Sequence, residues 1–322
     1  MTTYKDIKNA YQRISKHINK TPIFTSRSLN SKTGAELFLK CENLQRGGSF
    51  KMRGAVNAIS QLTEEQKKKG IVTHSSGNHA QAVALSAKLL HIDATVVMPN
   101  TSPKVKIEAT KDTYGANVVL CENSLQARQS TTKKLIDTYG YTLIHPYDND
   151  AVIAGAGTAA YELLLQIKNL DFIFAPVGGG GLLSGTSIAT KGFNKKIKII
   201  GVEPENVDDA YRSLQSNRIQ TNETTNSIAD GLLTNLSERT FSIIKKYVDR
   251  IITISEEQIL FAMKFIWERM KLVVEPSGAC SLGGVLSNRI PVKNKKIGVI
   301  ISGGNVDLSD FFEKYSRKIS GF

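Results

Sequence analysis

Cysteine is scarce in this sequence, and its three copies, Cys41, Cys121 and Cys280, are widely separated. They form no CxxC pair of the kind that zinc ribbons and thiol redox motifs use, and their odd number argues against a disulfide framework. We therefore expect reduced, mostly buried thiols. Long apolar runs are missing too, because no stretch approaches the roughly 18 residues of a membrane helix.

The N-terminal sequence Met1–Ile18 lacks the apolar core of a signal peptide and the arginine-rich, acid-poor character of a mitochondrial presequence. It is polar and amphipathic, and it runs directly into sequence with the composition of a folded domain. We expect a cytoplasmic protein with no membrane partner.

Acidic residues are fewer than basic ones, so the 322-residue chain carries a formal net charge of +13. A basic balance can indicate nucleic-acid binding. Here the lysines stand in short, separate runs, and neither zinc-finger spacing nor an aromatic RNA-binding signature accompanies them. The runs are Lys67–Lys69, Lys133–Lys134, Lys195–Lys196, Lys245–Lys246 and Lys293–Lys296. We expect no nucleic-acid partner, and the positive field would attract small anionic ligands.

Short β-branched runs alternate with helical stretches along the chain. Several runs are continuously apolar, such as Ile297–Ile301, which is typical of strands covered on both faces. The sequence therefore predicts an α/β fold with mainly parallel sheet. The predicted strands are Glu36–Cys41, Ile71–His74, Ala94–Met98, Asn117–Cys121, Thr142–His145, Phe172–Pro176, Ile197–Val202, Arg250–Ile254 and Lys296–Ser302. The predicted helices include Glu64–Lys69, Gln81–Leu90, Ser124–Tyr139 and Glu256–Met270.

Ligands of such folds bind where strands end in glycine-rich turns at helix N-termini. The turn Gly178–Gly181 follows a predicted strand, and its backbone N–H groups could surround an anion. It lacks the Gly-Lys-Ser/Thr ending of a nucleotide P-loop, so it predicts a phosphate monoester site.

A second glycine-rich segment, Gly155–Gly157, nearly matches a dinucleotide fingerprint. No strand ends directly before it, and no acidic residue follows about 20 residues later at the end of a second strand. We interpret it as a tightly packed helix start. An NAD oxidoreductase remains an alternative that rests on this segment alone.

Lys51 lies just past Gly47 and Gly48, at a predicted helix start. The positive end of a helix dipole would lower the pKa of this lysine and favour a Schiff base with a carbonyl cofactor. The phosphate-type turn elsewhere in the chain strengthens that interpretation.

Four motifs occur in a fixed order: Ser49–Ala55, Ser75–Ala82, Gly178–Leu182 and Ser302–Asn305. Together they resemble the fold type II pyridoxal-phosphate (PLP) enzymes, and within them the serine racemase and serine/threonine dehydratase group. The resemblance extends from Thr21-Pro22 to about Leu308. It implies a tryptophan synthase β-like fold with two open, twisted, mostly parallel sheets and helices on both faces. It also implies a large PLP-binding domain, 1–70 and 148–322, and a small mobile domain, 71–147.

The resemblance assigns Lys51 to the Schiff base, Phe50 to the ring, Asn78 to the 3′-hydroxyl and Ser302 to the pyridine nitrogen. A serine cannot keep that nitrogen protonated as a carboxylate would, which favours elimination of a β-hydroxyl. The implied phosphate ligands are the amides of Gly178, Gly179, Gly180, Gly181 and Leu182.

The implied substrate-binding residues are Ser75, Ser76, Gly77, Asn78, His79 and Arg128. The loop Ser75–His79 would bind the substrate carboxylate. Serine racemases carry a serine at the position of Ser76, which acts as acid/base on the face opposite Lys51, whereas threonine dehydratases usually carry alanine. Alternatively, Ser76 only completes the carboxylate site. Arg128 would suit a second carboxylate, or is a plain surface arginine.

A divalent cation, Mg²⁺ or Ca²⁺ with Mn²⁺ as a further option, is implied at Glu203, Asp209 and the carbonyl of Val207. The alternative is a helix N-terminus with favourable acids. ATP as an effector is put in doubt: Gln81, Lys271 and Asn305 match the nucleotide positions of the racemases, but Tyr147 stands where an asparagine is expected.

The predicted function is PLP-dependent β-elimination of L-serine and L-threonine type hydroxy-amino acids to a 2-oxo acid and ammonia, together with serine racemase activity. An L-threo-3-hydroxyaspartate ammonia-lyase is an alternative. A non-catalytic PLP-binding protein is another, although it would be expected to have lost Lys51 or Ser302. The implied partners are a small amino-acid substrate and a second copy of the chain in a homodimer.

Overall fold

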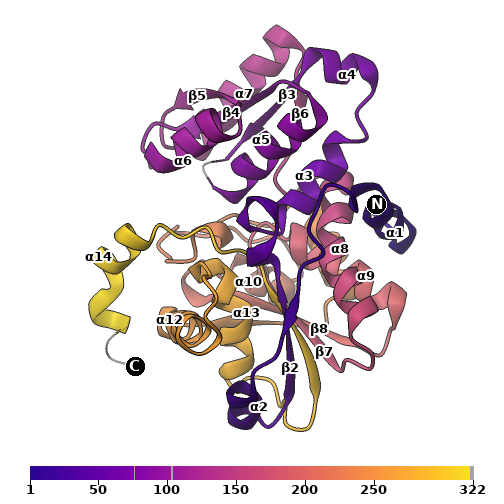
Figure 1. Cartoon of the computed structure of the whole chain (residues 1–322), viewed down its shortest axis with the longest axis vertical. Helices are drawn as coiled ribbons and strands as arrows, with labels where there is room; N and C mark the ends of the chain where they lie inside the picture. The colour runs from indigo at the N-terminus through magenta and orange to yellow at the C-terminus, as the bar shows by residue number, and fades with distance from the viewer. Residues whose placement is uncertain (76, 103, 320–322) are drawn as a thin grey trace.

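The computed structural model describes residues 1–75, 77–102 and 104–319, without the side chains of 105–106 and 316–319. It contains two sheets, which lie in the upper and lower parts of the molecule in Figure 1. The strands are β1 Ile23–Phe24, β2 Glu36–Cys41, β3 Ile71–His74, β4 Ala94–Pro99, β5 Asn117–Cys121, β6 Thr142–Leu143, β7 Phe172–Pro176, β8 Lys198–Pro204, β9 Arg250–Ile254 and β10 Lys296–Ile301. This confirms the α/β fold with two mostly parallel sheets.

The smaller sheet has the order β5-β4-β3-β6, and its strands are all parallel. The larger sheet has the order β1-β2-β10-β7-β8-β9, and only β1 runs antiparallel. The carboxyl ends of β2, β10, β7 and β8 therefore lie along one edge of the larger sheet, where ligands of open α/β folds bind.

Fourteen α-helices connect and cover the sheets in the described part of the chain. They are α1 Tyr4–Ile14, α2 Arg27–Thr33, α3 Lys51–Ile59, α4 Glu64–Lys69, α5 Asn78–Leu90, α6 Lys104–Glu108, α7 Leu125–Tyr139, α8 Asp150–Gln166, α9 Gly181–Phe193, α10 Asp209–Ser216, α11 Glu238–Tyr247, α12 Glu256–Phe265, α13 Pro276–Leu286 and α14 Leu308–Ile319. Across these described residues, none of the helices combines the length and the apolarity that crossing a membrane requires.

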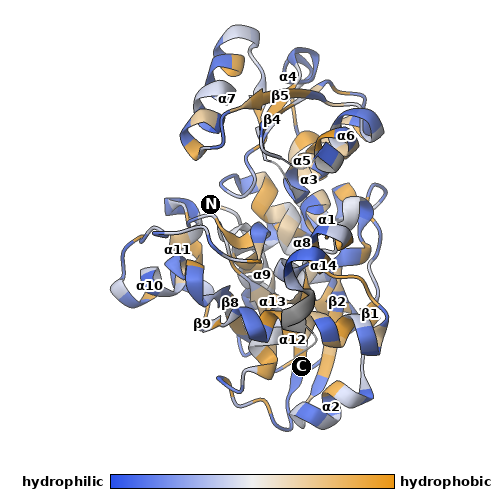
Figure 2. Ribbon diagram, turned by 90° about the vertical axis from the view of Figure 1, so that its left-hand side faces the viewer, coloured by the Kyte–Doolittle hydropathy of each residue, from blue (hydrophilic) through white to orange (hydrophobic). Residues whose placement is uncertain are grey.

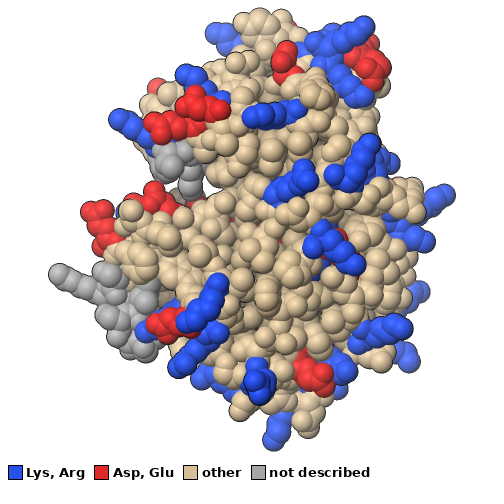
Figure 3. All heavy atoms as spheres, viewed as in Figure 1, with Lys and Arg blue, Asp and Glu red and all other residues tan. Residues whose placement is uncertain are grey.

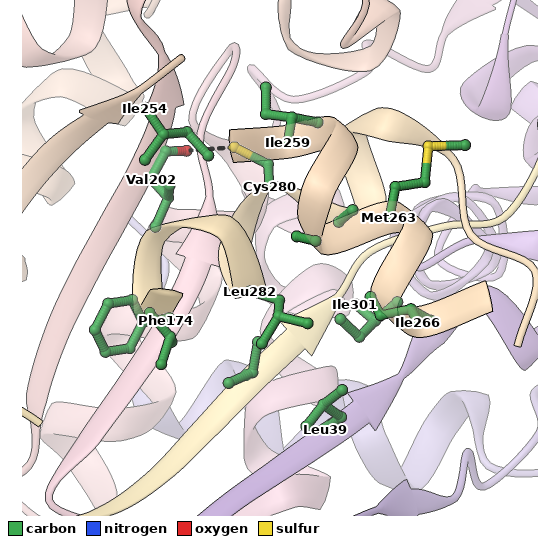
Figure 4. Packing of buried hydrophobic residues seen from close by; sticks show 14 of the residues in the cluster. Leu39, Phe174, Val202, Ile254, Ile259, Met263, Ile266, Cys280, Leu282 and Ile301 are labelled. Atoms are coloured by element: carbon green, nitrogen blue, oxygen red, sulfur yellow. Dashed lines mark hydrogen bonds between the residues drawn. The ribbon is translucent and has the colours of Figure 1, made fainter. Parts of the chain in front are cut away.

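Helices cover both faces of the larger sheet, which explains its continuously apolar strands. Successive residues of β7 point to opposite faces: Phe174 packs against α12 and α13, and Ile173 packs in the cluster formed with α8 and α9. Figure 4 shows the first of these layers, with Leu39, Phe174 and Ile301 on the strands facing Leu282 on α13. In Figure 2 the strands are mainly orange and the outer helices carry the blue residues.

The structure corrects several local predictions. The predicted strand 142–145 ends at Leu143, and the predicted helix 256–270 is α-helical only to Phe265 and closes with a π-helical turn, Ile266–Met270. Gly155 and Gly157 lie in the middle of α8, not at a helix start. A Cβ on Gly155 would lie 2.3 Å from the Arg53 carbonyl oxygen of α3. These glycines allow close helix–helix contact, which removes the basis for a dinucleotide site.

Basic side chains are spread over the surface and do not form a continuous stripe on the face shown in Figure 3. Acidic side chains stand among them, as in the surface ion pairs Lys67–Glu64 and Lys69–Glu65.

Candidate active site

Lys51 begins α3, as predicted, at the carboxyl edge of the larger sheet. The loop before it is tied to the turn after β10, because the Phe50 amide donates to the Ser302 carbonyl at 3.0 Å and the Gly304 amide donates to the Gly48 carbonyl at 2.9 Å. These two motifs thereby meet at one place, although they are about 250 residues apart in the chain. Such a separation is consistent with a fold built from crossovers. The structure brings Lys51, Phe50 and Ser302 together.

The Lys51 ammonium group has two neighbours that fix its position. Its Nζ donates to the Pro146 carbonyl at 2.9 Å and lies 5.2 Å from the centre of the Phe50 ring. Burial lowers the pKa of Lys51 to about 8, and the negative charge of Glu275 opposes that shift. Removal of the amine from water is therefore the main cause of the lowered pKa. A lysine with such a pKa supplies a neutral amine under mild conditions.

Asn78, at the start of α5, belongs to a side-chain network that joins both parts of the molecule. Its Nδ2 donates to Glu275 Oε1 at 2.7 Å, and its Oδ1 accepts from Asn305 Nδ2 at 2.8 Å. Asn305 Nδ2 also donates to the Gly47 carbonyl at 2.8 Å. Asn305, considered above for a nucleotide site, is thus engaged beside Lys51.

Glu275 is a site residue that the sequence did not reveal. It caps the start of α13, is 3 % exposed, and its carboxylate lies over the backbone of Gly303. An acidic residue before Pro276 at a helix start is common for reasons of capping alone, so the sequence pattern carries no separate signal of a site.

The turn Gly178–Gly181 joins β7 to α9 and has no room for side chains. Gly180 has φ 84°, a left-handed conformation that favours glycine. A Cβ on Gly179 or Gly181 would lie 2.4 or 2.8 Å from atoms of Tyr147. The turn is therefore a cradle of backbone N–H groups at a helix N-terminus, which fits a phosphate group.

The predicted substrate loop follows β3. Ser75 Oγ accepts from the Gly77 amide at 3.3 Å, and nothing described lies within 4 Å of a Cβ placed on Gly77. The loop therefore has open space beside it. The His79 ring is buried and bonds through Nε2 to the Ile144 carbonyl at 2.9 Å. Because Ile144 directly follows β6, this bond holds the end of that strand in place. Ser76 lies outside the described residues.

Two further histidines, His74 and His145, lie beside this loop, and no sequence pattern had indicated them as site residues. The rings of His74 and His145 are 5.6 Å apart, and His145 Nδ1 accepts from the Asp148 amide at 2.9 Å. Burial lowers the pKa of His145 to about 4, so it is neutral at physiological pH. The pKa of His74 is lowered by burial and then by Arg128, which places the half-buried Arg128 near this group.

The predicted cation ligands are close together. Glu203, at the end of β8, and Asp209, at the start of α10, are fully buried, as is Val207. Glu203 accepts from the amides of Ala210 and Tyr211 at 3.0 and 2.8 Å, which is the helix-capping arrangement considered as the alternative. Burial raises the pKa of both carboxyls, to about 6 for Asp209, and the charge of Asp209 raises the pKa of Glu203 further. Two buried acids without a bonded cationic side chain among the described residues are suited to a bound cation.

A half-buried lysine amine with a lowered pKa, together with a glycine turn at a helix N-terminus, defines the class of protein. Residues 14–303 match the family model described as pyridoxal-phosphate dependent enzyme, and the chain belongs to this family. It is an enzyme of the fold type II group, with PLP as its cofactor.

Among its relatives, the chain is 53% identical over 311 residues to the serine racemase of Dictyostelium discoideum, covering 95% of this chain and 96% of that protein. It is 46% identical over 320 residues to the L-threo-3-hydroxyaspartate ammonia-lyase of Saccharomyces cerevisiae, covering 99% and 97%. The structure of maize serine racemase superposes with a TM-score of 0.94 at 39% identity, covering 99% of this chain and 98% of that one.

Proposed function

We propose that the protein eliminates the β-hydroxyl of L-serine and L-threonine type amino acids, yielding a 2-oxo acid and ammonia, and that it also racemises serine. The observation that carries the proposal is the Lys51 amine, which has a pKa of about 8 and lies at the same sheet edge as the glycine turn. The names of the relatives, serine racemase and hydroxyaspartate ammonia-lyase, agree with this chemistry.

Bound PLP would supply an electron sink that withdraws electrons from the substrate Cα. Lys51 would hold the cofactor covalently and then, as a free amine, move the proton at Cα. The Ser302 hydroxyl, 3 % exposed, would face the pyridine nitrogen without fully protonating it. Phe50 would pack near the ring, Asn78 would bind the 3′-hydroxyl, and the amides from Gly178 to Leu182 would bind the phosphate.

The substrate carboxylate would bind the loop Ser75–His79, where the space beside Gly77 supports this role. Ser76 would return a proton on the face opposite Lys51, which would allow inversion at Cα. Arg128 would contact a second carboxylate, and its proximity to His74 favours 3-hydroxyaspartate as a further substrate.

We assign residues 71–147 to a small domain that closes on a large domain, 1–70 and 148–322, and so excludes water from the site. The two sheets, which divide near these boundaries, support that assignment. We further propose a cytoplasmic homodimer.

A product assay tests the reaction. We expect PLP-loaded protein to form 2-oxo acid from L-serine, L-threonine or L-threo-3-hydroxyaspartate, and D-serine from L-serine. We expect Ser76→Ala to reduce D-serine formation about 100-fold and to change elimination much less, because general acid–base catalysis contributes roughly that factor. Chiral chromatography combined with 2-oxo acid quantification separates the two products. Equal losses of both products would assign Ser76 to carboxylate binding only, and no product from any of the three substrates would contradict the proposal.

We also propose a divalent cation, Mg²⁺, Ca²⁺ or Mn²⁺, at Glu203, Asp209 and the Val207 carbonyl. The burial of both acids supports it. A cation bound only by the folded state raises the melting temperature, by about 5 °C at concentrations well above its dissociation constant. We expect this rise for the unchanged protein and for Glu205→Gln, an exposed acid nearby, and its loss in Asp209→Asn. Differential scanning fluorimetry with and without EDTA measures it, and an unchanged rise in Asp209→Asn would place the cation elsewhere.

A further inference from the structure

The chain returns from the smaller sheet to the larger one through residues 144–150, and the start of this crossover is fixed at the smaller sheet. The Ile144 carbonyl, just past β6, accepts from Thr73 Oγ1 of β3 at 2.8 Å and bonds to the His79 ring at 2.9 Å. Both hydrogen bonds are buried. The crossover therefore begins at a point that is held by two other segments of the chain.

His145 folds the residues that follow into a tight turn. Its Nδ1 accepts from the Tyr147 amide at 3.3 Å and from the Asp148 amide at 2.9 Å. Since Nδ1 accepts, the ring is neutral and its proton lies on Nε2. Burial, which lowers the pKa of His145 to about 4, keeps the ring in this form at physiological pH. The imidazole thus does what the side-chain oxygen of an asparagine does in an Asx turn.

The far end of the turn 145–148 is held by the larger part of the molecule. Arg239 of α11 donates through Nε to Asp148 Oδ1 at 2.9 Å and through Nη1 to Asp150 Oδ2 at 2.5 Å. The three side chains are partly exposed, so each ion pair contributes little to overall stability. Two bonds from one guanidinium nevertheless fix where the turn ends.

The turn presents one backbone carbonyl to the amine of the site. Pro146 lies inside the turn, and its carbonyl accepts from Lys51 Nζ at 2.9 Å. A lysine side chain has four carbons and many rotamers, so an acceptor in a fixed place decides where its amine lies. The bonds of His145 and Arg239 are what give the Pro146 carbonyl a fixed place.

We propose that His145 is a positioning residue for Lys51: its Nδ1 closes the turn 145–148 and so holds the Pro146 carbonyl that aims the lysine amine. An amine held in one orientation reacts faster than one that samples many rotamers, because its freedom is already restricted before the reaction. The inference rests on the proposed function, in which Lys51 holds the cofactor and moves the Cα proton.

Two substitutions separate the acceptor from the aromatic ring. His145→Asn keeps an acceptor near the place of Nδ1 and removes the ring. His145→Phe removes the acceptor and keeps a ring in edge-on contact with His74 and Tyr147. The measurement is the limiting rate at which apoprotein captures saturating PLP, followed by absorbance. We expect His145→Phe to slow capture about three- to tenfold, the effect of a lost hydrogen bond, and His145→Asn to stay within about twofold of the unchanged protein.

Steady-state kinetics give a second measurement. We expect kcat for 2-oxo acid formation to fall by the same factor in His145→Phe while KM stays unchanged, because the proposed carboxylate loop 75–79 lies outside the turn. Arg239→Gln releases the far end of the turn and leaves the ring in place, and we expect it to slow capture about twofold. His91→Asn is the matched control: His91 is exposed at the far end of α5, and asparagine tolerates its left-handed φ of 55°.

Circular dichroism and melting temperatures verify folding in every variant. The proposal is overturned if His145→Phe captures PLP at the unchanged rate, or if His145→Asn is slowed as much as His145→Phe or more, because the ring and not the acceptor would then matter. If His145→Phe does not fold, Arg239→Gln decides: slower capture supports the held turn, and an unchanged rate contradicts it. If the unchanged protein captures no PLP, the role of Lys51 and the proposed function fail as well, which differs from a loss confined to the variants.

Discussion

Lys51→Ala is expected to abolish turnover of every substrate and to remove the visible absorption of covalently held PLP. Lys51 supplies the nitrogen that holds the cofactor and the base that moves the Cα proton, so one substitution removes two functions. We expect a loss of at least about 1,000-fold, because each of these contributions is worth a factor of 100 or more. The measurements are the absorbance spectrum of the purified protein and the product assay.

The pH dependence of cofactor attachment follows from the same amine. The pKa of Lys51 is lowered from its ordinary value to about 8, so the neutral, reactive amine becomes dominant as the pH rises through about 8, more than two units earlier than for an exposed lysine. The rate at which apoprotein captures PLP should rise over that interval. Lys88→Ala, at a surface lysine of α5, is the control and should retain absorbance, activity and pH profile. A rate that rises only near pH 10 would contradict the assigned environment of Lys51.

Glu162→Gln is expected to produce the largest loss of stability. Glu162 is 1 % exposed and forms ion pairs with Lys40 at 2.5 Å and with Arg53 at 3.3 Å. Arg53 also pairs with Glu42 at 2.6 Å, so two buried cations balance two buried carboxylates. Removing one partner leaves an uncompensated buried charge, which costs about 3–5 kcal/mol of the free energy of unfolding. Since Arg53 lies on α3, the network also anchors the helix that begins at Lys51.

Thermal unfolding of the apoprotein measures this effect. For a chain of this length a loss of that size lowers the melting temperature by about 4–7 °C. Asp137→Asn is the matched control, because it removes the ion pair with Lys133 on the exposed surface of α7, and we expect a change within about 1 °C. If Glu162→Gln melted like this control, the buried ion pairs would contribute nothing measurable to stability, and their proposed anchoring of α3 would be wrong.

The sequence by itself determined the strands, because parallel strands covered on both faces must be apolar throughout, and burial leaves that signature locally. It also determined the positions of Lys51 and the glycine turn, since a turn without room for Cβ atoms admits only glycine. The structure confirms the α/β fold with two mostly parallel sheets. The residue roles carried over from the family resemblance remain predictions, and Ser76 lies outside the described residues.

Only the tertiary structure decided which other groups surround Lys51. Glu275, His145 and Pro146 lie far from Lys51 in the chain and reach it because strand order places their loops at one edge. Strand order follows from long-range packing, which no local pattern encodes. The structure likewise decided that burial lowers the pKa of Lys51 and that Gly155 serves helix packing. Both depend on what packs against a residue from distant parts of the chain.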